Sequence, residues 1–241
     1  MLFTIPNIIT VSNAFGGCLA IISILTGQVL WLPYIISFCF VADFADGLVA
    51  RLLKQHSEIG KELDSLADVI SFGVVPGTIF YYLINKSLGI DSLSWNDSSS
   101  WIGALGFIVT MFSVFRLAKF NTDKRQSEHF IGLSTPANTI FVIGILLTIE
   151  NNYWGLGDYL LNLSFLIPAI MILSYLLIAE IPMFSFKFKK FTWKNNEYRF
   201  LFILVTLIFL LALPLGIALM LIIATYLISS LILSWTGILK N

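Results

Sequence analysis

Long apolar runs dominate this chain and decide what it can fold into. A helix needs about 20 mostly apolar residues to cross the hydrocarbon core of a bilayer. Eight runs approach that length, and short polar connections separate them. We therefore expect an all-α, polytopic bundle of about eight transmembrane helices, over residues 8–26, 29–49, 65–85, 101–120, 136–150, 160–179, 199–212 and 214–235.

The composition excludes several classes of protein. Hydrophobic residues make up 58% of the chain and charged residues only 12%, more apolar surface than a water-soluble domain could bury. The formal net charge is zero, so nothing indicates a nucleic-acid partner. The start of the chain has neither a basic region nor a small-residue cleavage site, so we expect no cleaved signal peptide. Cys18 and Cys39 lie inside apolar runs, so we expect no disulfide or metal site from them.

Lysine and arginine residues predict the side of the membrane that each connection faces. They follow the second, fourth, sixth and eighth runs, whereas no basic residue lies in connections 87–99 and 151–159. Because an excess of Lys and Arg marks cytoplasmic loops, we expect both termini in the cytosol. The loop 185–198 mixes lysines with aromatic residues, which suits anionic headgroups and ordinary positive-inside topology equally well.

One short stretch of the chain, residues 43–68, is strongly acidic and reads DFADGLVARLLKQHSEIGKELDSLAD. Asp43 and Asp46 end the second run, and Asp64 and Asp68 begin the third; each spacing places both carboxylates on one helical face. The connecting loop is short, so we expect the two faces to meet near the cytosolic boundary. Carboxylates gathered there repel one another unless divalent cations lie between them. Oxygen ligands suit Mg²⁺, Mn²⁺ or Ca²⁺.

The rest of this stretch suits a diphosphate bound to such ions. Two metal ions would clamp the diphosphate and stabilise a displacement at phosphorus. Gly47, Ala50 and Gly60 leave room beside the carboxylates, and Arg51 offers a planar fork for phosphate. An alternative of another class is a cation transporter, whose carboxylates would form an ion path. Against it, the carboxylates lie at one membrane face rather than at the midplane, and no inverted repeat is visible.

The pattern D-x2-D-G-x2-A-R-x8-G-x3-D-x3-D resembles the signature of the CDP-alcohol phosphotransferase family, membrane enzymes of phospholipid synthesis, and matches it at every position. The resemblance implies a cytidine diphosphate-linked donor at the cytosolic helix ends and two divalent ions, Mg²⁺ or Mn²⁺. It implies that Asp68 is the general base for the acceptor hydroxyl. The implied metal ligands are Asp43, Asp46, Asp64 and Asp68. The implied donor site includes two of these, Asp46 and Asp64, together with Gly47, Ala50, Arg51 and Gly60.

Flanking segments are similar to the phosphatidylserine synthases of bacteria and archaea within this family. These segments are IPNIITVSN, SFGVVPG, FRLAKFN and FIGLSTPAN, beginning at residues 5, 71, 115 and 130. The likeness implies CDP-diacylglycerol and L-serine as substrates, phosphatidylserine and CMP as products, and a multi-pass protein of the cell membrane with its active site facing the cytosol. It covers about residues 1–180, the expected catalytic domain, and leaves the basic loop and two further helices in 181–241. Family members often form homodimers. Lys119 and Ser134 depart from the family's pattern, where we expect Arg and Pro.

A cluster at the end of the fourth run is a candidate acceptor site. Arg116 lies about one turn inside the membrane boundary, which is costly unless it faces a polar cavity. With Lys119 and Asn121, we expect it to contact the carboxylate of serine or a phosphate of the donor; snorkelling to the headgroups is the alternative. The competing acceptor is glycerol 3-phosphate, as in phosphatidylglycerophosphate synthase, which would need more cations around the site.

Polar residues on the first run are candidates for the donor site. Asn7, Thr10 and Asn13 are spaced by three, so they share one helical face. We place Asn7 and Thr10 at the donor site, although hydrogen bonds between packed helices explain the spacing equally well. We expect no catalytic role for His56 and His129.

Overall fold

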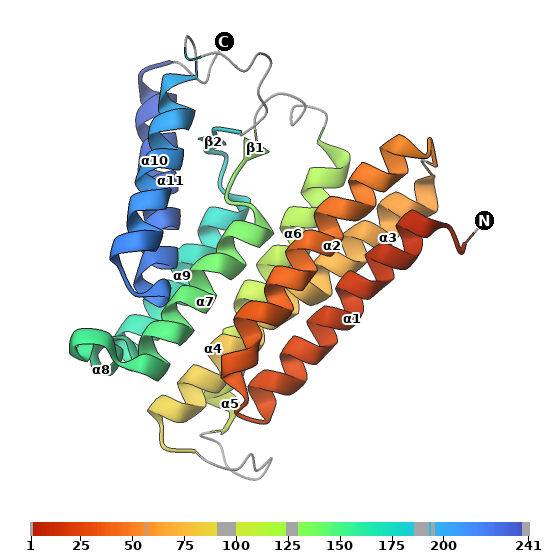
Figure 1. The fold of residues 1–241 in the computed structure, drawn as a ribbon. Coiled ribbons are helices and arrows are strands. Elements are labelled where there is room, and N and C mark those ends of the chain that lie inside the picture. Colours follow the sequence, from red (N-terminus) through yellow and green to blue (C-terminus); the bar gives the residue numbers. More distant parts are fainter. Residues whose placement is uncertain are drawn as a thin grey trace.

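The computed structural model describes residues 2–55, 57–90, 100–123, 130–185, 193 and 196–237, which are mainly helical (Figure 1). Each of the eight expected runs coincides with a helix or with consecutive helical segments. In order, the elements are α1 Ile5–Leu25, η1 Val29–Trp31, α2 Leu32–Leu52, α3 Glu58–Asp68, η2 Val69–Val74, α4 Val75–Ser87, α5 Ser100–Gly103, η3 Ala104–Phe107, α6 Ile108–Thr122, β1 Phe130–Ile131, α7 Thr135–Asn151, η5 Tyr153–Gly155, α8 Leu156–Leu160, α9 Leu163–Ile178, β2 Pro182–Met183, α10 Glu197–Ala212 and α11 Leu215–Trp235.

Four helical stretches of the described residues are long and apolar enough to cross a membrane. They are Ile5–Leu25, Glu58–Ser87, Trp101–Thr122 and Leu215–Trp235. A fifth is counted if α7 and the segment Tyr153–Leu160, which bend by 109°, form one span. Helix α9 is apolar but shorter. The prediction of a membrane-embedded helical bundle is therefore supported, whereas the count of eight spans stays a prediction.

Side-chain caps explain where the site-bearing helices begin. Ser57 accepts a hydrogen bond from the Gly60 amide at 3.0 Å and caps α3. Ser134, which replaces an expected proline, accepts one from the Ala137 amide at 3.3 Å and caps α7, and Pro136 occupies the first turn of that helix. Ser134 thus caps the start of α7 even though it replaces the expected proline.

A widened turn follows Asp68 inside the long helix of α3 and α4. Residues Val69–Val74 form a π-helical turn, a feature frequent at functional sites. Helix α1 packs closely against it: a Cβ on Gly17 would lie 2.9 Å from the Cα of Ser71. Because Gly17 allows this approach, the preceding turn of α1 comes next to the end of α3.

The two ends of the chain build opposite sides of the molecule. In Figure 1, α1 and α2 stand on one side and α10 and α11 on the other, with α7 and α9 between them. The ends of α2, α6 and α11 and the start of α1 lie toward one end of the bundle, on the same side as the short antiparallel ribbon of β1 and β2, and α7 begins below this ribbon. Cys39 is buried and Cys18 exposed, and both are free thiols.

Candidate active site

The carboxylates of α2 and α3 meet at this end of the bundle. Asp43, Asp64 and Asp68 each offer one oxygen, and these three oxygens lie within 4.8 Å of one another. Among the described residues, no lysine or arginine forms a salt bridge with any of them. No salt bridge within the described part of the chain therefore balances the negative charge of the cluster.

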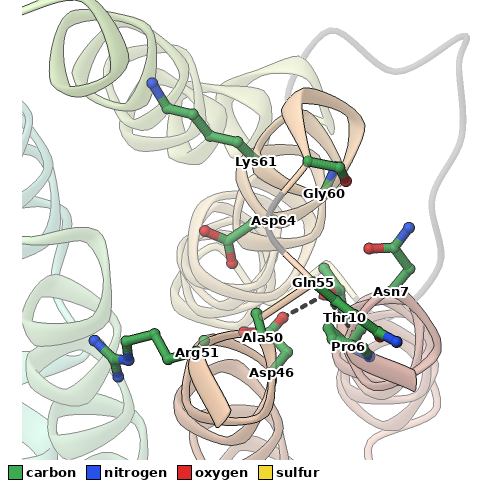
Figure 2. A pocket seen from close by; sticks show the side chains of 12 residues that line it. Pro6, Asn7, Thr10, Asp46, Ala50, Arg51, Gln55, Gly60, Lys61 and Asp64 are labelled. Atoms are coloured by element: carbon green, nitrogen blue, oxygen red, sulfur yellow. Dashed lines mark hydrogen bonds between the residues drawn. The ribbon is translucent and has the colours of Figure 1, made fainter. Parts of the chain in front are cut away.

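Asp46 lies apart from that group of three and faces α1. The hydroxyl of Thr10 donates a short hydrogen bond to its Oδ2 (Figure 2). Both side chains are buried. The sequence assigned Asp46 to both the metal site and the donor site and Thr10 to the donor site; in the structure the two form one polar pair between α1 and α2.

The chemistry of the cluster fits a hard divalent cation. All three close donors are carboxylate oxygens, the ligands that Mg²⁺ and Mn²⁺ prefer. Oδ1 of Asp64 is buried and has no hydrogen-bond partner in the described part of the chain, which is costly for a carboxylate oxygen unless a cation or another ligand pairs with it.

Asp68 has one polar neighbour from α1. The Nδ2 of Asn13 lies 3.5 Å from Oδ1 of Asp68 and donates a weak hydrogen bond to it. Asn13 is fully buried, and its own Oδ1 has no partner among the described residues. The spacing of three along α1 pointed to Asn13, but it could not show which carboxylate Asn13 faces.

A pocket of about 280 Å³ opens between α1, α2 and α3, and we call it the α1–α3 pocket (Figure 2). It contains every residue that the sequence assigned to the donor site. The sequence did not assign Pro6, Gln55, Ser57 and Lys61, three of which belong to the motif stretch itself. The lining residues are Pro6, Asn7, Thr10, Asp46, Gly47, Ala50, Arg51, Gln55, Ser57, Gly60, Lys61 and Asp64.

The two motif glycines of this pocket have different surroundings. A Cβ on Gly47 would meet no atom within 4 Å, so Gly47 leaves open space inside the pocket. A Cβ on Gly60 would lie 3.1 Å from both Asn7 Oδ1 and Ser57 Oγ, so Gly60 allows α3 to approach α1. Gly47 therefore keeps the pocket open, whereas Gly60 allows the helices that form its walls to pack closely.

A second hollow of about 600 Å³, the central cavity, lies on the other side of Asp64, which lines both. Asp43 and Asp68 line it too, and so does Arg116, which is 6% exposed. Arg116 Nε donates to the carbonyl of Leu133 at 2.6 Å. The remaining walls are largely apolar. The arginine thus faces the kind of partly polar cavity that its depth requires.

The other two candidates for the acceptor site at the end of α6, Asn121 and Lys119, have different surroundings. Asn121 lines the central cavity and donates from Nδ2 to Ser65 Oγ at 2.7 Å. Lys119 does not line it; its Nζ forms an ion pair with Glu180 Oε1 at 3.1 Å. Arg116 and Asn121 are brought together, and Lys119 is turned toward the segment before β2.

The central cavity also includes residues beyond the expected catalytic domain. These come from the segment that follows β2, from α10 and from α11, and they were not predicted: Phe184, Ser185, Phe202, Ile222, Ile223 and Tyr226. No motif marks them: all but Ser185 are apolar or aromatic residues, which are common throughout this chain.

The chain is similar to known proteins over most of its length. Residues 3–181 match the family model described as CDP-alcohol phosphatidyltransferase. A Helicobacter pylori relative is 31% identical over 212 residues, covering 86% of this chain and 82% of the relative. Relatives from Mycobacterium tuberculosis (31% identical over 189 residues, 74% of this chain and 60% of the relative) and Bacillus subtilis (34% over 133 residues, 55% and 69%) share its name, CDP-diacylglycerol–serine O-phosphatidyltransferase. The chain belongs to the CDP-alcohol phosphatidyltransferase family.

Proposed function

We propose that the chain transfers the phosphatidyl group of CDP-diacylglycerol to the hydroxyl of L-serine, giving phosphatidylserine and CMP. The observation that carries this proposal is the position of Asp64, which lines both hollows. Its carboxylate cluster therefore stands between a small pocket that suits a nucleotide and a larger cavity with a buried arginine. The family supports phosphatidyl transfer, and the names of the relatives support serine as the acceptor.

The α1–α3 pocket is the proposed site for the cytidine diphosphate. Arg51 supplies positive charge on its wall, and Lys61 also lines it, with its Nζ donating to the carbonyl of Asn121 at 3.2 Å. The open space at Gly47 admits the nucleotide next to the helix backbone. Thr10 holds the carboxylate of Asp46 in one orientation beside that space. Donor binding is thus assigned to side chains from three helices whose relative positions are fixed by packing.

The carboxylate cluster is the proposed metal site. Asp43, Asp64 and Asp68 would hold the ion on the side of the central cavity, and Asp46 would serve a second ion on the side of the α1–α3 pocket. Bound Mg²⁺ or Mn²⁺ would neutralise the charge of the diphosphate and stabilise its displacement.

Asp68 is the proposed general base. Its carboxylate takes the proton of the serine hydroxyl while that oxygen forms a bond to the phosphorus that carries the diacylglycerol. The bond from this phosphorus to the bridging oxygen breaks, and CMP leaves with the electron pair. Asn13 steadies one oxygen of Asp68. Arg116, buried beside the cluster, would hold the serine carboxylate.

The orientation in the membrane is part of the same proposal. Arg51, Lys54 and Lys61 border the end of the bundle at which the carboxylates lie. The positive-inside rule then places this end, and both chain termini, in the cytosol. We propose eight spans in the cell membrane, and a homodimer as in other members of the family.

The direct test is CMP release by the purified protein. The assay contains CDP-diacylglycerol, Mn²⁺ or Mg²⁺, and serine, glycerol 3-phosphate or inositol phosphate. We expect CMP with serine alone. CMP with glycerol 3-phosphate instead would overturn the acceptor and keep the metal site. No CMP with any acceptor, together with cation flux in proteoliposomes that lack the donor, would favour a transporter.

A further inference from the structure

Helix α11 lies outside the matched family region but is packed tightly onto the catalytic helices. Its contact with α7 is backbone to backbone at two glycines. A Cβ on Gly144 would lie 2.8 Å from the carbonyl oxygen of Gly216, and a Cβ on Gly216 would lie 2.9 Å from that of Gly144. Small residues of this kind allow close helix packing in membranes. The position of α11 is therefore fixed relative to α7.

From this position, Tyr226 reaches the end of the central cavity. Its hydroxyl donates to the carbonyl of Phe184 at 2.9 Å. Its ring packs edge-to-face against Phe184, with centroids 4.8 Å apart, and also contacts Phe202. Since Phe184 directly follows β2, this hydrogen bond ties α11 to the two-stranded ribbon.

The ribbon in turn continues to the residue that holds Arg116. Strand β1 pairs with β2, and beyond the strands the Gly132 amide donates to Ile181 and the Leu133 amide to Leu176, both at 2.9 Å. Gly132 has a φ of +77°, and a Cβ there would lie 2.8 Å from the carbonyl of Ala179, so this bend requires glycine. The carbonyl of Leu133 then accepts the hydrogen bond of Arg116 Nε at 2.6 Å.

We propose that Tyr226 is a positioning residue for the acceptor: through the ribbon of β1 and β2 it fixes the Leu133 carbonyl and thereby aims the Arg116 guanidinium into the central cavity. Nε is occupied by Leu133, so the remaining guanidinium N–H groups face the acceptor in a set orientation. The last two helices then take part in acceptor recognition. This inference rests on the proposed role of Arg116.

The test compares two Tyr→Phe variants in the same aromatic cluster. Tyr226→Phe keeps the ring and removes the hydrogen bond to Phe184. Tyr198→Phe is the matched control, because Tyr198 also packs against Phe184, at 5.6 Å, but does not line the cavity, and its hydroxyl has no hydrogen-bond partner among the described residues. The KM for serine, the KM for CDP-diacylglycerol, and the hydrogen exchange of the Gly132 and Leu133 amides are measured for both.

We expect Tyr226→Phe to raise the KM for serine about fivefold, the effect of losing one hydrogen bond. The KM for the donor should stay unchanged, and the Gly132 and Leu133 amides should exchange faster; Tyr198→Phe should change none of these. Equal behaviour of the two variants, or an equal rise in both KM values for Tyr226→Phe, would overturn the proposal.

A double variant with Arg116→Lys distinguishes a positioning role of Tyr226 from direct contact between Tyr226 and the acceptor. In Arg116→Lys the Nε donor is lost, so adding Tyr226→Phe should raise the KM no further. Additive effects would mean that Tyr226 touches the acceptor itself, and would overturn the positioning role. If the wild-type protein uses another acceptor, the serine assignment fails and the same KM comparison is made with that acceptor. If it uses no acceptor, the exchange of the Gly132 and Leu133 amides in the two variants decides whether Tyr226 fixes the position of Leu133.

Discussion

The α1–α3 pocket and the central cavity share Asp64, yet the chain specifies them in different ways. Nine of the twelve residues that line the pocket come from positions 46–64, inside one motif. The residues that line the central cavity run from Phe40 to Tyr226 and belong to at least six helices. The residues of the proposed nucleotide site are thus encoded largely in one local segment, whereas the proposed acceptor side is assembled by the packing of the whole bundle.

The largest effect is expected at the cluster between the two hollows. Asp68→Asn should lower kcat by about 10²- to 10⁴-fold, the usual contribution of a general base. The KM for CDP-diacylglycerol should change little, because Asp68 lines only the central cavity. Steady-state kinetics at saturating Mn²⁺ measure both quantities. Turnover above a tenth of the wild-type value would refute the base assignment.

A change at the shared wall should affect both sides at once. Asp64→Asn should raise the Mn²⁺ concentration for half-maximal activity by at least about tenfold, because even the loss of outer-shell partners costs about 10- to 100-fold in metal affinity. The KM for the donor should rise with it. The measurement is a Mn²⁺ titration of CMP release at several donor concentrations.

A matched control is Asp158→Asn, the same chemical change at an exposed position of α8. It should leave the titration unchanged. A normal Mn²⁺ requirement for Asp64→Asn would mean that Asp64 is not a metal ligand. It would also refute the proposal that Asp64 links metal binding to donor binding.

The two arginines sharpen the comparison. Arg116→Ala should raise the KM for serine by about 10- to 100-fold, since hydrogen bonds to charged groups contribute about 1.5–3 kcal/mol. Arg51→Ala should raise the KM for the donor instead, because Arg51 lines only the α1–α3 pocket. Kinetics with each substrate varied in turn separate the two. A rise only in the donor KM for Arg116→Ala would assign Arg116 to a phosphate.

The helices, and the gathering of the motif residues around one pocket, could be predicted from the sequence for a common reason. Apolar runs must form helices in lipid, because backbone polar groups have no other partners there. The spacings of Asp43 with Asp46 and of Asp64 with Asp68 then determine which faces meet. The number of spans does not follow from the apolar runs alone, because α7, α9 and α10 are only 16 or 17 residues long and α7 leads into a sharp bend.

The acceptor side was predicted less well because spacing does not identify the neighbour of a side chain. Arg116 and Lys119 are three residues apart, which suggested a shared role. In the structure Arg116 meets the Leu133 carbonyl and the cavity, and Lys119 meets Glu180. Tyr226 lies 110 residues from Arg116 in sequence, and only the packing of α11 onto α7 brings it to the same cavity. Such contacts depend on helix rotation, which periodicity alone leaves open.

A smaller effect is expected where a methyl group would enter the space of the pocket. Gly47→Ala should raise the KM for the donor several-fold while the thermal stability stays equal or increases. Alanine in place of glycine inside a helix favours folding by about 0.5–1 kcal/mol, and a Cβ at Gly47 meets no protein atom within 4 Å. Kinetics and thermal unfolding in detergent measure the two effects. Gly60→Ala is the counterpart, and should lower stability because its Cβ would crowd Asn7 and Ser57.

The smallest effect is expected at Lys119. Its side chain is 35% exposed and pairs with a 65% exposed Glu180, and exposed ion pairs contribute only about 0.2–1 kcal/mol. Lys119→Ala should therefore change the KM for serine by less than about twofold, and Glu180→Ala should match it. Equal small effects of the two variants would mean that the ion pair only holds the end of α6 close to the segment before β2. A tenfold rise in the serine KM for Lys119→Ala alone would instead place this lysine in contact with the acceptor. The proposed acceptor site would then depend mainly on one short segment, FRLAKFN, just as the proposed nucleotide pocket depends mainly on the aspartate motif.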